Sequence, residues 1–303
     1  MTEEKVWTPQ RAANRLSKIM EVVGSVHGGR FPVDVPMLAL EAATIFGWPD
    51  PITEVTPVDI KSFDGALFPD DERKKWMLLF NSAMASPGRI RFTQAHELGH
   101  YILHRQARPA FQCSSDDMLD WEDKTIEAQA DLFASYLLMP LDDFRAQVTS
   151  TVDLELLGYC AERYGVSLTA AVLKWLQYTE ENAVLVLSRD GFMQWAFSSK
   201  KASRAGVFFR TRKQAVEIPS GSLAADPSVR QERRGIELPA KIWFPHAEAE
   251  TFVREMKVSS DQFEYVLSLL ILPRSATVWR TFLSPLWSGK SFDGQKHANN
   301  NSR

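Results

Sequence analysis

Five consecutive residues constrain this chain more than any other feature. They are His96-Glu97-Leu98-Gly99-His100, in a segment whose pattern predicts a helix. Residues four apart on a helix differ by about 40° in azimuth and lie about 6 Å apart along the axis. The two imidazoles can therefore converge on one ion, and zinc binds imidazole nitrogen at about 2.0–2.1 Å. Glu97 lies beside that face, where its carboxylate can accept a proton from a metal-bound water.

A catalytic zinc needs a third protein ligand. His104 lies about 12 Å from His96 along a straight helix, too far to share one ion, so we expect it to contact the site or to be a packed ring. Glu127 belongs to a segment with a helical apolar stripe, where burying a carboxylate is costly without a partner such as zinc. Asp131, one turn on, can accept the outer N–H of a ligand histidine. Spacing alone leaves a solvated acidic face as the alternative for both carboxylates.

Two blocks around these residues resemble the ImmA/IrrE family of metallopeptidases. They are RFTQAHELGHYILH at 91–104 and EAQADLFASYLLMP at 127–140, and the interval between them matches as well. The resemblance covers roughly residues 10–180. The pattern of helices and short strands predicts an α+β fold, and the resemblance implies a zincin-like, thermolysin-like peptidase domain. It also implies the site residues: His96, His100 and Glu127 as metal ligands and Glu97 as catalytic base.

The ligand set of two nitrogens and one oxygen favours one zinc ion per chain, with manganese or iron as alternative occupants. The oxyanion formed during peptide hydrolysis needs a second donor, and Tyr101 and His104 are the nearest candidates. Tyr101 lies about 100° around the helix from His100, so packing in the core is its alternative interpretation. The strand predicted at 76–80 can pair with an extended substrate through its edge, but its apolar run fits a central strand equally well.

The resemblance also implies the substrate. Members of that family typically relieve repression by cleaving a helix-turn-helix repressor, in a stress response or during induction of a mobile element. A zinc-containing regulator without proteolytic activity is one alternative. A DNA-binding transcription factor is another, because Gly165 and Ser167 separate two helical patterns in 154–178. The second of these helices carries one cation, Lys174, whereas recognition helices present several polar or basic residues, so packing on the peptidase domain is preferred.

Composition limits the compartment and the partners. The 303 residues include 35 Lys and Arg against 38 Asp and Glu, which excludes a strongly basic nucleic-acid-binding chain. Cys113 and Cys160 form no C-x-x-C pair, so we expect neither a disulfide framework nor a thiolate metal site. No apolar run approaches the ~20 residues of a membrane span, and the N-terminal residues contain no apolar signal segment. We expect a soluble protein of the reducing cytoplasm, with no membrane partner.

Local patterns predict four units along the chain. These are a unit of helices and short strands at 1–140, a helix-turn-helix-like segment at 141–180, a β-rich domain at 181–287 and a disordered tail at 288–303. The family resemblance implies that the first is a zincin-like metallopeptidase domain and that the third is sensor-like. Helices are predicted at 9–24, 34–46, 86–105 and 122–138, and strands at 53–60, 63–68 and 76–81. Further strands are predicted at 183–187, 192–197, 241–244, 251–258 and 263–272, with long connections at 106–120 and 199–238.

Overall fold

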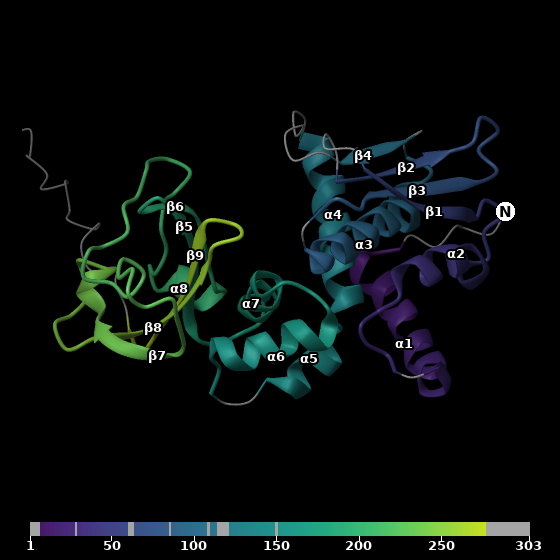
Figure 1. The fold of residues 1–303 in the computed structure, drawn as a ribbon. Helices are drawn as coiled ribbons and strands as arrows, with labels where there is room; N and C mark the ends of the chain where they lie inside the picture. Colours follow the sequence, from purple (N-terminus) through teal and green to yellow (C-terminus); the bar gives the residue numbers. More distant parts are fainter. Residues whose placement is uncertain are drawn as a thin grey trace, which may run out of the picture.

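The computed structural model describes residues 7–27, 29–59, 64–84, 86–107, 110–113, 121–148 and 151–276. The described chain has an N-terminal half of helices and a mixed sheet, a group of connecting helices, and a C-terminal antiparallel sheet (Figure 1). The predicted α+β class is therefore confirmed. The predicted disordered tail lies outside the described residues. Among the helices that are described, none is both long and apolar enough to cross a bilayer.

In the N-terminal half, helices lie beneath one face of a mixed sheet (Figure 1). The elements are α1 (Pro9–His27), α2 (Val35–Phe46), β1 (Ile52–Val58), β2 (Gly65–Pro69), β3 (Trp76–Asn81), α3 (Pro87–His104), β4 (Phe111–Cys113) and α4 (Trp121–Leu138). The strand order is β1-β3-β2-β4, with β1 parallel to β3 and the other pairs antiparallel. Because β3 lies between β1 and β2, the hypothesis of substrate pairing along the edge of 76–80 is wrong.

Residues that favour helix starts and stops set the helix boundaries in this half. Asp34 and Ser86 accept hydrogen bonds from the backbone N–H groups of Met37 and Arg89, and these caps begin α2 and α3. Gly47 ends α2 with a φ of 76°, a left-handed conformation that costs glycine little. The cap of α3 matters for function because it fixes where the helix carrying the two histidines begins.

Three short helices connect the two halves: α5 (Leu141–Gln147), α6 (Leu154–Tyr164) and α7 (Leu168–Leu176). Gly165 ends α6 in the left-handed region, and Ser167 caps α7 by accepting from the N–H of Ala170. The predicted break between two helices is therefore confirmed. The guanidinium of Arg91, on α3, donates to the carbonyl of Gly165, so the turn between α6 and α7 is held against the helix that carries the histidines.

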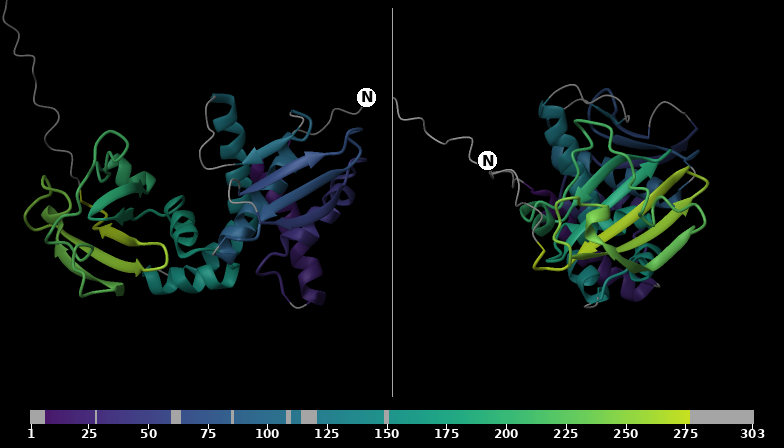
Figure 2. Two further views of the ribbon diagram at one scale, coloured as in Figure 1. Left: turned by 45° about the horizontal axis from the view of Figure 1, so that its top comes forward. Right: turned by 90° about the vertical axis from the view of Figure 1, so that its left-hand side faces the viewer.

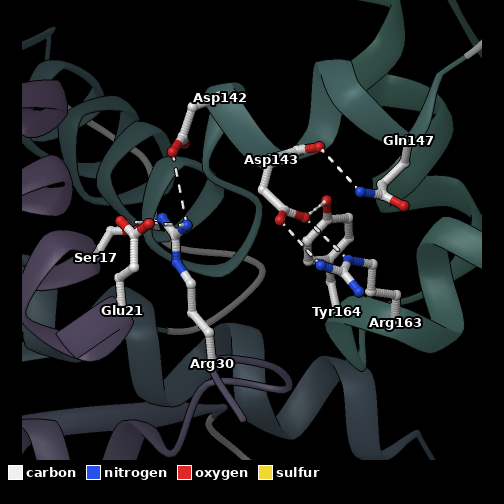
Figure 3. A network of polar contacts seen from close by, with 8 residues as sticks. All are labelled: Ser17, Glu21, Arg30, Asp142, Asp143, Gln147, Arg163 and Tyr164. Carbon is white, nitrogen blue, oxygen red and sulfur yellow. Dashed lines mark hydrogen bonds and ion pairs between the residues drawn. The ribbon is translucent and has the colours of Figure 1, made fainter. Parts of the chain in front are cut away.

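A polar network fixes the connecting helices to their neighbours (Figure 3). Arg163 on α6 donates two hydrogen bonds of 2.9 Å to the carboxylate of Asp143 on α5, and the hydroxyl of Tyr164 donates a third at 2.6 Å. Arg30, which follows α1, forms an ion pair of 3.6 Å with Asp142. A two-pronged Arg–carboxylate pair is among the stronger polar contacts of a protein, so α5 and α6 act as one packed unit.

The C-terminal half is built on an antiparallel sheet, seen face-on at the right of Figure 2. Its elements are β5 (Asn182–Arg189), β6 (Phe192–Ser198), α8 (Lys200–Arg204), β7 (Gln231–Pro239), the 3₁₀ helix η1 (Ala240–Ile242), β8 (Phe252–Ser260) and β9 (Tyr265–Leu272). The strand order is β6-β5-β9-β8-β7. On β5, Ala183 and Leu185 join the core shared with the helices, whereas Val184 and Val186 join a second core. Burial of both faces explains the continuous apolar run of this strand.

The structure corrects three predictions of local structure. The strand predicted at 241–244 is wrong: η1 occupies this position, and the rings of Trp243 and Phe244 both pack into the second core. The connection predicted at 199–238 contains α8 and β7, and the one predicted at 106–120 contains β4. Both missed strands lie at sheet edges and pair on one side only, so they need no long apolar alternation.

Candidate active site

The helix that carries both histidines is buried over most of its length. Residues 93–102 of α3 are all buried, and Glu97 and His100 are each 0% exposed. A helix buried on all sides is a core helix, and polar groups placed on it need specific partners. The partners of the buried polar side chains of α3 must therefore come from the elements packed around this helix.

The nearest of these neighbours brings a carboxylate to the two rings. The Nε2 atoms of His96 and His100 lie 2.9 Å apart. One carboxylate oxygen of Glu127, on α4, lies 3.0 Å from Nε2 of His96, and the other lies 3.4 Å from Nε2 of His100. Within the described part of the chain, these three residues form a group whose ligand atoms all lie within 4.8 Å of one another. The two nitrogens and one carboxylate form a donor set that suits zinc.

A glycine allows α3 and α4 to approach closely enough for this geometry. A Cβ atom on Gly99 would lie 3.0 Å from Cδ1 of Phe133 and 3.2 Å from Cα of Ala130. Any larger residue at position 99 would push α4 outward, and Glu127 lies one turn from the contact. The third residue of the cluster thus depends on a small residue within the H-E-x-x-H motif itself.

Side chains behind the two rings orient them. Nδ1 of His96 lies 2.9 Å from a carboxylate oxygen of Asp131, the contact that the helical spacing predicts. Nδ1 of His100 lies 3.3 Å from Nδ1 of His104, whose Nε2 lies 2.9 Å from Oε1 of Gln129. The amide oxygen of Gln129 can only accept, so His104 donates through Nε2 and accepts at Nδ1 from His100. Both rings of the cluster thus present an unprotonated Nε2 to the same point.

Protonation at neutral pH agrees with this arrangement. Burial lowers the pKa of His100 to about 4, so its ring is neutral at pH 7 and its Nε2 lone pair can bind a metal. Burial alone would raise the pKa of Glu127. A proton held on Nε2 of His96 or His100 in place of a metal outweighs that effect through its hydrogen bond and charge, so the pKa of Glu127 lies well below the usual range. The cluster therefore presents two neutral nitrogens and one carboxylate.

Tyr101 is not brought to the cluster. Its buried hydroxyl donates a 2.8 Å hydrogen bond to the carbonyl of Asp50, and its ring packs edge-on against Trp48 and Trp76. Tyr101 is therefore a core residue, which was the alternative interpretation of its position. His104, the other candidate oxyanion donor, lies behind His100 as described above.

Two residues of the site were missed by sequence reasoning. Phe111, on β4, stacks on the ring of His100 with centroids 4.6 Å apart, but it belongs to a segment that looked like a polar loop. Gly65, on β2, lies so close to α3 that a Cβ there would be 2.7 Å from Oε1 of Glu97 and 2.6 Å from Cγ2 of Thr93. Nothing in the local sequence of 63–68 distinguishes this glycine from one in an ordinary strand.

We expect Gly65→Ala to destabilise the protein by about 1–3 kcal/mol and to reduce activity, because the new methyl group must displace Thr93 or Glu97. Urea unfolding measures the first effect. Gly221→Ala is the matched control, since its Cβ would meet only Ile242, at 3.7–3.8 Å. Equal stability of the two variants would contradict the prediction.

The fold and the cluster together define a metallopeptidase domain of the H-E-x-x-H type. Residues 51–176 match the family described as the IrrE N-terminal-like domain (Peptidase_M78), and this segment is an IrrE N-terminal-like domain. The match runs from β1 to the end of α7 and so contains α3 and α4. A solved Mycobacterium tuberculosis transcriptional regulator aligns at a TM-score of 0.47 and 15% identity, over 88% of this chain and 82% of that one. No curated protein matches the chain.

Proposed function

We propose that the protein is a metal-dependent endopeptidase that cleaves a helix-turn-helix transcriptional repressor and so relieves repression, in a stress response or during induction of a mobile element. The observation that carries the peptidase activity is the meeting of His96, His100 and Glu127, with Glu97 on the adjacent position of the same helix. The substrate class is supported by the resemblance of the two blocks at 91–104 and 127–140 to the ImmA/IrrE family. The match to an IrrE N-terminal-like domain agrees with that resemblance.

In the proposed mechanism, His96, His100 and Glu127 would hold one zinc ion, with manganese or iron as alternatives. A bound metal of this kind polarises the substrate carbonyl and lowers the pKa of a water molecule. Glu97 accepts the proton of the attacking water and then donates it to the leaving amine nitrogen. Asp131 keeps Nε2 of His96 directed at the metal position by accepting from its Nδ1.

The proposed organisation has three units before the tail. The zincin-like peptidase domain would comprise 1–140, and the helical segment 141–180 would connect it to the sensor-like domain at 181–287. An extended substrate would pass along β4, an edge strand whose Phe111 touches His100.

The DNA-binding alternative is not favoured by the geometry of α7. None of the residues of this helix is exposed, and Lys174 is 1% exposed with its ammonium bonded to Ser135. A recognition helix must instead present polar side chains to the groove. We expect binding to duplex DNA, measured as a function of salt, to show no sequence preference. A preference lost on changing exposed residues of 154–178 would favour the alternative.

Co-expression tests the proposed substrate. Candidate helix-turn-helix repressors, beginning with any encoded beside this protein, are expressed with the wild type or with Glu97→Gln, and fragments are mapped by mass. We expect one repressor to be cut at one site by the wild type only. Intact repressors throughout, with metal bound to the protein, would favour the regulator without proteolytic activity.

A further inference from the structure

A cavity separate from the His-His-Glu cluster lies between the two halves of the chain. Its volume is about 600 Å³, and its walls come from α3, α4, α7 and the start of β9. Apolar side chains form most of the wall, among them Phe92, Leu132, Leu173 and Tyr265. Pockets of about 300–1,000 Å³ between domains, with apolar walls and a few polar groups, are typical of small-molecule sites.

One wall of this cavity carries a buried cation. Lys174 is 1% exposed, and its ammonium donates to the carbonyl and hydroxyl oxygens of Ser135, at 3.2 and 3.3 Å. The ring of Tyr136 lies 3.8 Å from the ammonium. Within the described residues, no carboxylate lies within ion-pair distance of it. A buried ammonium with neutral partners only is costly, and burial lowers the pKa of Lys174 to about 7.

The other charged groups around the cavity do not neutralise Lys174. The side chain of Arg89 is 58% exposed and is paired with Asp64 at 2.6 Å. Asp131 also lines the cavity, but its carboxylate accepts from His96. Of the two cationic side chains that line the cavity, Arg89 is paired, whereas Lys174 has no carboxylate within ion-pair distance among the described residues, and most of the surrounding wall is apolar.

We propose that this cavity binds a small amphipathic anion, whose carboxylate pairs with Lys174 and whose apolar chain or ring lies against Phe92, Leu132 and Leu173. The anion supplies the counter-charge that the protein does not provide, and the apolar wall supplies the affinity for the remainder of the molecule. Since Asp131 lines the cavity and contacts His96, the bound molecule would lie next to the metal cluster.

Calorimetric titration of the full-length protein tests this proposal. The probes are decanoate and 4-phenylbutyrate, and each is compared with its own uncharged amide. For at least one pair, we expect the acid to bind the wild type at least tenfold more tightly than the amide. In Lys174→Met the acid and the amide should bind within twofold of each other, whereas Lys18→Met, which removes an exposed lysine of α1, should behave as the wild type.

A second variant tests the contribution of the apolar part of the cavity to binding, independently of the charge of Lys174. Leu132→Trp fills the apolar part, so we expect both acid and amide to lose binding while the metal content stays unchanged. This variant also keeps the proposal falsifiable if Lys174→Met does not fold. The proposal is overturned if neither acid binds the wild type, if acid and amide bind equally, or if Leu132→Trp binds them as the wild type does.

Discussion

Replacing Glu97 with glutamine is expected to reduce cleavage of the target repressor by roughly 10²–10⁴-fold, the usual contribution of a general acid–base group, without loss of metal. Glutamine has nearly the same shape as glutamate, so the packing of this fully buried side chain against β2 is kept. It cannot accept a proton from water, however, and the proton transfer to the leaving amine is lost with it. The measurement is the rate of fragment formation from the purified repressor, with the metal content determined on the same sample.

The control for this variant is Glu41→Gln, which makes the same chemical change at an exposed position of α2. It should cleave at the wild-type rate. If Glu97→Gln cleaved as fast as this control, Glu97 would not be the base. If the wild type cut no repressor but Glu97→Gln still changed transcription as the wild type does, a regulator without proteolytic activity would be the better explanation.

The sequence predicted the meeting of His96 and His100 because its signals are local or repeat at helical spacing. His96 and His100 lie on one helix face by arithmetic alone, and two of the helix starts in this half, at Asp34 and Ser86, have capping residues that the structure uses. The position of Glu127 could not be predicted from spacing alone, because a carboxylate on a solvent-exposed helix face has the same spacing. The resemblance to the ImmA/IrrE family was needed to predict Glu127 as a metal ligand. The approach of α4 to α3 that decides between these alternatives depends on Gly99 and Ala130, a contact between segments far apart in the sequence.

What the sequence did not predict depends on pairing partners that no local pattern shows. β4 is three residues long and exists through its pairing with β2, and β7 is a largely polar strand held by β8. The cavity could not be predicted either, because Lys174 looked like the one charged residue of an otherwise apolar helix. Only the packing of α7 against α4 shows that this cation faces Ser135 rather than solvent.

Replacing Glu127, the proposed third ligand, with alanine should weaken zinc binding strongly. A structural zinc site of four ligands contributes about 10–16 kcal/mol, so one ligand corresponds to about 2.5–4 kcal/mol, or roughly 10²–10³-fold in affinity. The loss should be measured by competition with a chromophoric chelator. The rise in melting temperature that zinc gives the wild type should also disappear, because that rise depends on binding to the native state.

Asp131→Asn provides the graded comparison, because it leaves all three ligands in place and changes only the group that accepts from Nδ1 of His96. Loss of such an outer contact typically weakens metal binding about 10–100-fold, so this variant should lie between the wild type and Glu127→Ala. Glu162→Ala, an exposed carboxylate on α6, should bind zinc as the wild type does. Wild-type affinity in Glu127→Ala would mean that His96 and His100 find their third partner elsewhere, and the assignment of α4 to the metal site would fail.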